Sequence, residues 1–401
     1  MARVSLETVP PEEAIRFFRA KHDLRSFDWR DLWQAEHAAA FTVAKSAGFD
    51  ILGDIREALD QALAEGATGQ AFKKRLKPLL QAKGWWGRRE VVDPLTGQVV
   101  EATLGTPRRL QTIYRTNLRT AYAAGQWERI QRVKGGMPYL AYYTAGDERV
   151  RDEHRRWHGT VLPVDHPWWQ THFPPNDWGC RCKAVQLSRR QLEQRGLEVS
   201  EEPSSATRSW RNKRTGKVET VPEGVGPGWA YNPGAVRGAQ LGRVLADKIG
   251  AMPEPMARAA VQDMLGGSGA RYLMAGKPDA VPLPVTVLPP VIERALGGET
   301  LQLAMLSAAT AARQVSRHGD VGVEDYAVVQ QLVDRGRARV EGSRHVGFMG
   351  WVAGQLWKAV VKWTADGRER HVTTLRRATP RNLRAFERRG ELLRDEAPGG
   401  P

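Results

Sequence analysis

The feature that most constrains this chain is a pair of cysteines separated by a single residue. Cys180 and Cys182 are the only two cysteines among the 401 residues, and four of the nine histidines lie between positions 154 and 172. On an extended chain, side chains two residues apart point to the same side. Cysteines that close along the chain are badly placed to form a disulfide with each other. The pair is therefore suited to offer two thiolates to one metal ion.

Zinc is the metal that this donor set favours, because it takes about four nitrogen or sulfur ligands in a tetrahedron. We expect His154 to join Cys180 and Cys182 around a structural zinc ion. The candidates for the fourth ligand are Asp147, His166 and His172. The competing interpretation is a pair of buried thiols in a Trp-rich core with hydrogen-bonded histidines, since C-x-C is a less typical spacing for zinc than C-x2-C.

Several motifs around these cysteines form a wider pattern. Its central residues are Asp147, Arg151, His154, His158–Gly159, Pro174–Pro175 and WGCRC at Trp178–Cys182. The pattern resembles the phage Mu F-type head morphogenesis proteins, which are minor head proteins of tailed phages and prophages. Four further stretches resemble the same family: PPEEAIRFFRAK near the N-terminus, GWWG at Gly84–Gly87, Tyr114–Trp127 and Val221–Gly234. The resemblance covers roughly residues 1–235.

The resemblance implies a minor head protein of a tailed phage or prophage. Such a protein is made in the bacterial cytoplasm and packaged inside the virion head near the portal, so the implied partners are the portal and other head proteins. The formal net charge of +15 also favours a polyanion such as phage DNA as a neighbour. A nonspecific DNA-binding structural protein is therefore an alternative.

Composition excludes two other classes. Two cysteines do not make a disulfide-stapled secreted scaffold. The chain has no run of about eighteen apolar residues, so no membrane partner is expected, and its N-terminal stretch lacks the apolar core of a signal peptide.

Hydrophobic spacing predicts an α+β fold whose N-terminal part is mainly helical. Helices are expected over residues 28–45, 51–64, 68–81 and 106–132, with a hairpin over 91–102. The last helix is rich in arginine, which fits a solvated face or a nucleic-acid or portal surface. Strands over 139–143 and 180–186 are expected to pair in an antiparallel hairpin that carries the Cys-x-Cys and brings His154 near it. The predicted regions are 1–105 (helical), 106–235 (Mu F-like core) and 236–284 (a helical, Pro- and Gly-containing linker).

The character of the sequence changes in the C-terminal part, residues 285–391, ahead of a tail at 392–401 that we expect to be disordered. Helices are predicted over 301–312 and 326–335, followed by a small antiparallel sheet with strands over 344–349, 358–364 and 370–375. Asp366-Gly367 lies between the last two strands and is typical of a hairpin turn.

The segment WKAVVKWTADGRERHVTTLRRAT closes this part. With the preceding helices it resembles the barnase–EndoU–colicin–RelE class of small RNases, over about residues 285–390. That resemblance implies an endoribonuclease that needs an acid, a base and cations around the phosphate but no catalytic metal. The candidate catalytic residues are His318, Lys362, His371, Thr373, Arg376 and Arg377. The competing interpretation is a set of exposed polar residues on a basic sheet, and whether the chain is an enzyme stays open. A toxin-type RNase delivered with phage DNA is an alternative main role.

Overall fold

The computed structural model describes residues 10–48, 50–204, 206–277, 279–295, 302–317 and 319–395, which divide into two units. Unit 1 contains residues up to 19, 25–38 and 42–236, and unit 2 contains residues 20–24, 39–41 and 237 onward. Helices and strands are mixed, in agreement with the predicted α+β class. Within these ranges, no helix is long and apolar enough to cross a membrane.

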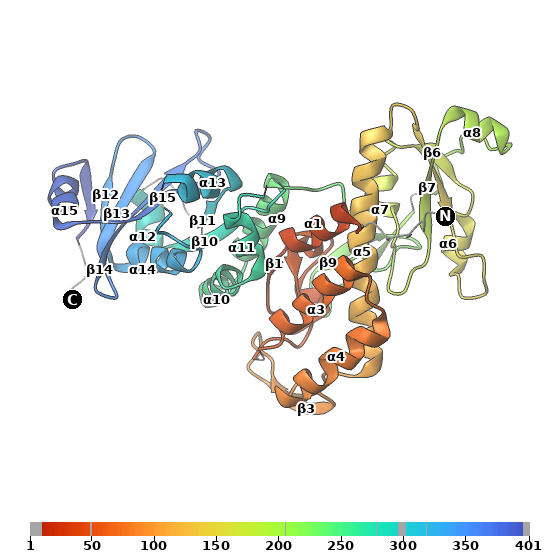
Figure 1. The fold of residues 1–401 in the computed structure, drawn as a ribbon, viewed down its shortest axis with the longest axis horizontal. Coiled ribbons are helices and arrows are strands. Elements are labelled where there is room, and N and C mark those ends of the chain that lie inside the picture. The colour runs from red at the N-terminus through yellow and green to blue at the C-terminus, as the bar shows by residue number, and fades with distance from the viewer. Residues whose placement is uncertain are drawn as a thin grey trace, which may run out of the picture. The chain divides into compact units, whose positions relative to one another are not determined.

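The helical part of unit 1 is arranged around one long helix, α5 (Pro107–Val133). The Thr106 hydroxyl accepts a hydrogen bond from the Arg109 amide at 3.2 Å, and Pro107 occupies the first turn, so the sequence itself marks the start of α5. Helices α3 (Leu52–Glu65) and α4 (Gly69–Ala82) contact α5 and each other (Figure 1). The predicted helices over 51–64, 68–81 and 106–132 are confirmed.

Helix α1 (Glu12–Ala20) approaches α5 closely at a glycine. A Cβ atom at Gly125 would lie 2.8 Å from the Ala14 amide nitrogen. Gly125 therefore lets two helix backbones come nearer than any larger residue would allow.

The predicted helix over 28–45 is wrong. This stretch forms a 3-10 turn, η1 (Trp29–Asp31), one helical turn, α2 (Glu36–Ala39), and a short strand, β2 (Ala40–Phe41), which pairs in parallel with β1 (His22–Asp23). The Asp31 carboxylate accepts from the amides of Phe27 and Asp28, each at 2.8 Å. Such side-chain-to-backbone bonds compete with continuous helix, and spacing of apolar residues does not reveal them.

Two β-ribbons project from the helical part. The predicted hairpin over 91–102 is β3 (Arg88–Val92) with β4 (Val99–Thr103), and a second ribbon, β8 (Thr207–Arg211) with β9 (Val218–Pro222), lies within the following extended segment. Arg214 in the second turn donates to both carboxylate oxygens of Asp93 in the first. This ion pair ties the two turns together.

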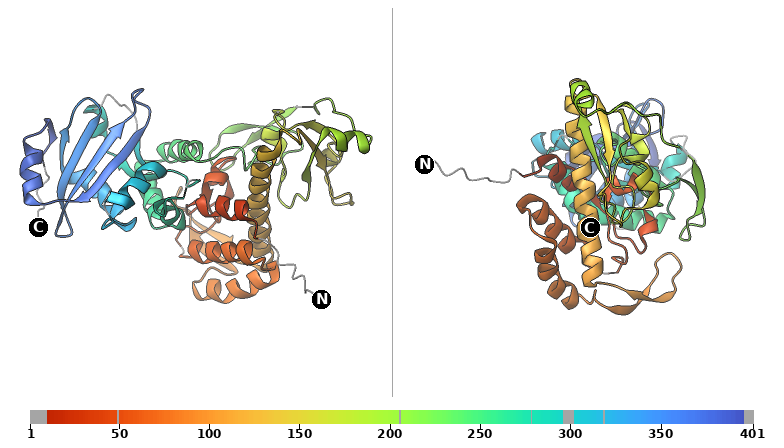
Figure 2. Two further views of the ribbon diagram at one scale, coloured as in Figure 1. Left: turned by 45° about the horizontal axis from the view of Figure 1, so that its top comes forward. Right: turned by 90° about the vertical axis from the view of Figure 1, so that its right-hand side faces the viewer.

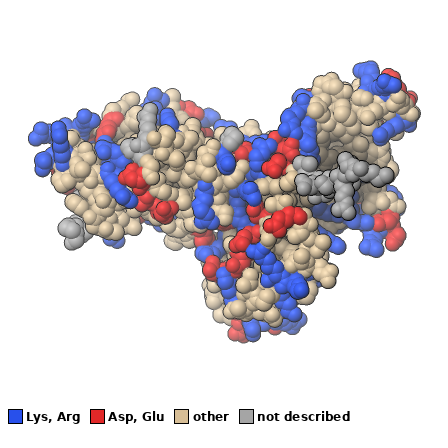
Figure 3. Space-filling model, in the orientation of Figure 1, with Lys and Arg blue, Asp and Glu red and all other residues tan. Residues whose placement is uncertain are grey.

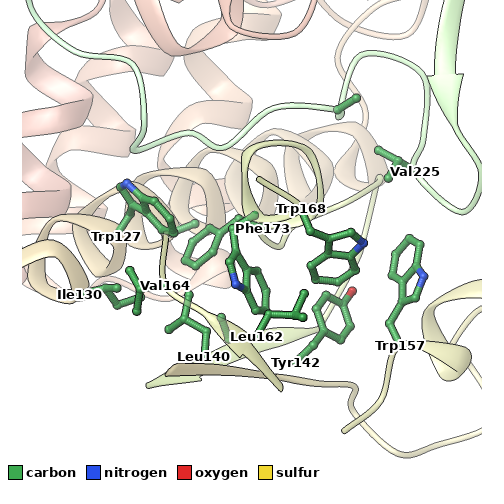
Figure 4. Packing of buried hydrophobic residues seen from close by; sticks show 14 of the residues in the cluster. Trp127, Ile130, Leu140, Tyr142, Trp157, Leu162, Val164, Trp168, Phe173 and Val225 are labelled. Atoms are coloured by element: carbon green, nitrogen blue, oxygen red, sulfur yellow. The ribbon is translucent and has the colours of Figure 1, made fainter. Parts of the chain in front are cut away.

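The core of unit 1 lies between α5 and a three-stranded antiparallel sheet. Strand β5 (Tyr139–Tyr143) is central, flanked by β6 (Val161–Pro163) and β7 (Lys183–Leu187). Figure 4 shows Trp127 and Ile130 of α5 facing Leu140 and Tyr142 of β5, with further aromatic rings filling the space between. These rings come from Trp157, Trp168, Trp169 and Phe173, around the short helices α6 (Asp152–Arg156) and α7 (Trp169–His172). Burying one such ring contributes roughly 2–3 kcal/mol, which is why this stretch of sequence is rich in tryptophan. Helix α8 (Arg189–Gln194) follows β7.

Unit 2 begins with three helices, within the stretch over 236–284 that the sequence predicts to be a helical linker. These helices are α9 (Ala239–Gly250), α10 (Glu254–Leu265) and α11 (Ser268–Met274). Their buried faces include Leu245, Val261 and Leu273. Residues 237–277 are therefore part of the packed structure of unit 2.

A seven-stranded sheet forms the body of unit 2, larger than the small sheet that the sequence predicts. Its order is β10 (Leu283–Leu288), β11 (Gln302–Leu306), β15 (Arg370–Arg377), β14 (Gln355–Trp363), β13 (His345–Val352), β12 (Arg337–Val340) and β16 (Glu391–Arg394). Every pair is antiparallel except β11 with β15. Most of this sheet is drawn in shades of blue in Figure 2. The three predicted C-terminal strands are confirmed as the middle of this sheet.

The predicted helix over 301–312 is wrong in its first half. Residues 302–306 form the buried strand β11, and only then does α13 (Ala308–Arg317) begin. A short apolar run reads equally as strand or helix until its partners are known. Here β11 has a strand on each side.

Further helices cover the sheet. Helix α14 (Ala327–Arg335) follows the 3-10 turn η2 (Glu324–Tyr326) and packs on β10, β13 and β14, whereas α13 packs on β15. Helices α12 (Pro290–Ala295) and α15 (Pro380–Glu387) complete the unit. Of the tail expected over 392–401, residues 392–394 belong to β16, and residues 396–401 lie outside the described residues.

Candidate functional site

His154, Cys180 and Cys182 meet in the interior of unit 1. The His154 Nδ1 atom lies 3.8 Å from the Cys180 Sγ atom and 3.5 Å from the Cys182 Sγ atom, and the three ligand atoms lie within 4.8 Å of one another. His154 and Cys180 are buried and Cys182 is partly buried. These three residues are called the His-Cys cluster below.

The elements that position the cluster differ in one respect from the sequence prediction. His154 lies on the short helix α6, and β5 pairs with β7 in the predicted antiparallel direction. The two cysteines, however, precede β7 in a loop, because the strand begins only at Lys183.

The ring of His154 is held in one orientation. Its Nε2 atom lies 2.9 Å from the Gly224 carbonyl oxygen, and the ring stacks on Trp157 with centroids 5.0 Å apart. Since a carbonyl only accepts, Nε2 carries the proton and Nδ1 presents its lone pair to the sulfur atoms.

The two thiols influence each other strongly. The hydrogen bond from Cys182 lowers the pKa of the Cys180 thiol, with a further contribution from His154. The hydrogen bond with Cys180, together with burial, raises the pKa of the Cys182 thiol. Burial also raises the pKa of the adjacent Tyr142 hydroxyl, which donates to the Asn176 side-chain oxygen at 2.9 Å. The pair thus gives up one proton readily and the second with difficulty.

The other predicted metal ligands lie elsewhere. Asp147 forms a bidentate ion pair with Arg181, and His166 lies 3.9 Å from the Glu202 carboxylate. His172 stacks on Trp168 with centroids 4.5 Å apart and contacts the Thr171 hydroxyl. Within the described parts of the chain, the group of metal-type ligands contains His154, Cys180 and Cys182 alone.

The arginines of α5 serve mainly to hold unit 1 together. Arg109 donates to the carbonyl oxygens of Thr103 and Leu104, and Arg119 donates to the Cys180 carbonyl oxygen. Burial lowers the pKa of Arg109 to about 10, which leaves it charged at neutral pH. Arg129 and Arg132 both pair with Glu13. Four arginines of the predicted basic face thus contact groups of unit 1 itself.

Surface charge is mixed on the face drawn in Figure 3. Lysine and arginine are spread over both units there, with aspartate and glutamate among them. That face offers no single large basic patch of the kind that tracks a nucleic-acid backbone.

In unit 2, two of the predicted catalytic residues line one polar cleft of about 300 Å³. Lys362 of β14 and Thr373 of β15 line it together with residues of α13 and β13. The full lining is Thr310, Arg313, Gln314, His345, Lys362, Thr373 and Thr374. Two consecutive residues of β15, Thr373 and Thr374, line the cleft because the strand has a bulge there. Val360 pairs with Thr374 but Val361 pairs with Val372, which leaves Thr373 as the extra residue.

The remaining predicted catalytic residues lie outside this polar cleft. His371 lines a different hollow, of about 650 Å³, and contacts the Glu369 carboxylate at 3.2 Å. Arg376 lies 3.5 Å from the Asn382 side-chain oxygen, and Arg377 stacks over Trp357. His318 lies outside the described residues.

His345 is the residue that sequence reasoning missed. It pairs directly with Lys362 across β13 and β14, and burial, with Lys362 and Arg344 nearby, lowers the pKa of its imidazole. The signal was present in the sequence: two strands predicted over 344–349 and 358–364 place these two residues opposite each other when folded as a hairpin.

Comparison with known proteins points to one family. Residues 53–185 match the family described as Phage Mu protein F like protein. The chain is 40% identical over 244 residues to the putative capsid assembly protein F of Escherichia phage Mu, covering 57% of this chain and 55% of that protein. It is 37% identical over 224 residues to the Mu-like prophage FluMu F protein of Haemophilus influenzae, covering 52% of this chain and 53% of that protein. The chain spans about half the length of these curated relatives. No solved structure matches the chain.

The family match lies entirely within unit 1. All three residues of the His-Cys cluster lie within residues 53–185, whereas every residue of unit 2 lies outside that range. The part of this chain that is similar to Phage Mu protein F is therefore the part that carries the His-Cys cluster.

Proposed function

We propose that this chain acts in head morphogenesis of a Mu-like phage or prophage, as a minor head protein packaged near the portal. The observation that carries the proposal is the 40% identity to a putative capsid assembly protein over 244 residues. The family match also contains α5 and β5, which frame the aromatic core of unit 1, so the similarity extends to the residues that determine the fold. Portal and other head proteins are the proposed partners.

The test is deletion of the gene from an inducible prophage, with the full-length chain supplied in trans as the control. We expect the deletion to reduce the yield of DNA-filled heads at least tenfold, as counted by electron microscopy, and complementation to restore it. Mass spectrometry of purified particles should detect the polypeptide. Normal heads that lack the polypeptide would contradict the proposal.

A second candidate function, RNA cleavage by unit 2, is favoured by the polar cleft. A histidine, a lysine and an arginine surround a space large enough for a phosphodiester, and three threonines also line it. His345 would accept the proton of the ribose 2′-hydroxyl and return it to the leaving 5′-oxygen. Lys362 with Arg313 would stabilise the negative charge of the pentavalent phosphate. This chemistry uses no metal ion. Because His371 and Arg377 lie outside the cleft, their predicted catalytic roles give way here to His345.

Cleavage of labelled total RNA by the full-length protein tests this second function. We expect activity that resists chelators, and a loss of at least about 100-fold in the His345→Ala and Lys362→Ala variants. His371→Ala and Arg377→Ala, both on β15, are the controls and should retain activity, because His371, although it pairs with Lys362 across the strands, lines the other hollow. An inactive wild-type protein would exclude the function, and loss of activity in His371→Ala alone would move the site to the second hollow. The alternative role as a delivered toxin requires that the wild-type protein cleaves RNA.

A further inference from the structure

We propose that the His-Cys cluster binds one Zn²⁺ ion through three protein ligands and leaves the fourth coordination position to water or a small anion. This inference concerns unit 1, and only its last experimental arm, with a portal protein, rests on the proposed function. It rests on four observations: ligand spacing, orientation of the imidazole, position of the other polar residues, and a small adjoining cavity.

The spacing of the ligand atoms fits a tetrahedral zinc ion. Bonds of about 2.1 Å to nitrogen and 2.3 Å to sulfur, set at the tetrahedral angle, place the two donor atoms about 3.6 Å apart. The observed separations from His154 Nδ1 are 3.5 Å to Cys182 and 3.8 Å to Cys180. A hydrogen-bonded thiol–imidazole pair could match one of these distances, but a shared metal ion accounts for both at once.

The protein prepares His154 to be a ligand. The Gly224 carbonyl fixes Nε2 as the protonated nitrogen and leaves Nδ1 free to coordinate. Gly224 itself has φ +80°, and a Cβ atom there would lie 2.7 Å from the Trp157 ring on which His154 stacks. A glycine is therefore required at the position whose carbonyl oxygen orients the ligand.

The fourth position is not filled by another ligand-type side chain among the described residues. Asp147 is engaged by Arg181, and His166 and His172 have partners of their own. Beside the cluster lies a cavity of about 20 Å³, lined by Arg149, Arg151 and Arg181 among others. A cavity of this size holds about one water molecule.

The surrounding charge determines which exchangeable ligand is favoured. Arg149, Arg151 and Arg181 line the cavity, although Arg151 pairs with Asp177 and Arg181 with Asp147. Two thiolates with one neutral imidazole make the bound zinc electrically neutral. A small anion therefore enters the fourth position without the repulsion that a negatively charged centre would exert. A free anion and a carboxylate side chain of a partner protein share this chemistry.

The experiment uses the full-length protein and needs no variant for its first step. Elemental analysis should give about one zinc per chain, and X-ray absorption of the zinc form should give two sulfur and two lighter ligands with a single imidazole. Replacement of zinc by Co²⁺ should produce the visible absorption of a tetrahedral site, and thiocyanate should shift that absorption in a saturable way. Addition of a carboxylate-bearing portal protein, if it shifts the same absorption, would identify a protein source for the fourth ligand.

Two variants complete the test. Cys182→Ser should lower Zn²⁺ affinity at least 100-fold, whereas His166→Asn, a predicted ligand that lies outside the cluster, should bind as wild type does. Absence of bound metal in the wild-type protein would overturn the proposal. A second imidazole in the X-ray spectrum, or Co²⁺ absorption that thiocyanate leaves unchanged, would overturn the open fourth position.

Discussion

The His-Cys cluster of unit 1 and the polar cleft of unit 2 are constructed in opposite ways. The cluster brings together residues from a short helix and a loop, in a buried position next to aromatic rings. The polar cleft is an open hollow between α13 and the strands β13, β14 and β15. Polar atoms in an interior must be satisfied by partners, and in the cluster the imidazole and the thiols contact one another and the Gly224 carbonyl oxygen. Polar residues in an open cleft are satisfied by water and indicate a function only through their arrangement.

Each unit also contains one buried arrangement whose polar groups depend on each other. In unit 1 it is the His-Cys cluster, and in unit 2 it is the ion pair between Glu293 and Arg370. The Arg370 Nη2 atom lies 2.9 Å from the Glu293 Oε2 atom, and the two side chains are 5% and 2% exposed. The comparison can be tested by removing one member of each arrangement and measuring which unit loses stability.

The largest effect is expected in unit 2 from Arg370→Met. This change leaves the Glu293 carboxylate buried without its cation, which costs about 3–5 kcal/mol. Burial already raises the pKa of Glu293, while Arg370 acts to lower it. The free energy of unfolding from denaturant titration measures the loss. Arg243→Ala, which removes a largely exposed ion pair with Glu369, is the control and should cost less than about 1 kcal/mol. Equal losses in the two variants would contradict the burial argument.

Removal of metal should destabilise unit 1 by about 3 kcal/mol when free zinc is held near 100 times its dissociation constant. Hydrogen exchange measured by mass spectrometry, with and without chelator, locates the change. We expect faster exchange in β5 and β7 and unchanged exchange in β13 and β14, which lie in the other unit. If exchange in β5 and β7 is the same with and without chelator, the cluster contributes no metal-dependent stability.

Acid should weaken unit 1 through His172. Burial lowers the pKa of His172 from its ordinary value of 6.5 to about 4, so the unfolded chain binds a proton more readily than the folded chain between these values. The contribution of neutral His172 is complete above about pH 6.5 and is lost as the pH falls toward 4, by up to about 2 kcal/mol. Urea titrations of the metal-free protein at pH 7 and pH 4.5 measure it. The His172→Phe variant should lose less stability over this interval, and an identical loss would exclude His172 as the cause.

The smallest effect is the difference in stability loss between alanine substitutions at two glycines near the cluster. Gly224 and Gly179 both have positive φ, but only at Gly224 would a Cβ atom collide with a neighbour, the Trp157 ring. Alanine at Gly179 should cost about 1 kcal/mol for the left-handed backbone, and alanine at Gly224 about 1 kcal/mol more. Thermal unfolding measures the difference. If both substitutions cost the same, the ring adapts and the close approach of Gly224 is not required.

Secondary structure with strong local signals could be predicted from the sequence. The start of α5 at Thr106-Pro107 and the hairpin turn at Asp366-Gly367 depend on neighbouring residues alone. The stretch over 28–45 and strand β11 could not be predicted in the same way. In the first, the Asp31 carboxylate binds backbone amides, and in the second, strands on both sides decide between helix and strand.

The candidate sites divide similarly. Two cysteines one residue apart and a preceding histidine were sufficient to predict the His-Cys cluster, because a ligand set is a matter of chemical type as well as position. The fourth position could not be predicted, since Asp147 is drawn away by Arg181, a partner 34 residues distant. In unit 2, the bulge at Thr373 and the pairing of His345 with Lys362 determine which side chains share the polar cleft.

By itself, the sequence determined the class of fold, the helices α3, α4 and α5, and the donor atoms that a metal ion would select. Only the tertiary structure decided which donors converge, that residues 20–24 and 39–41 belong with the C-terminal unit, and which histidine faces the polar cleft. The physical reason is range: caps, turns and donor chemistry act between neighbours along the chain. Burial, strand register and competition between ion pairs depend on residues that meet only when the chain is folded.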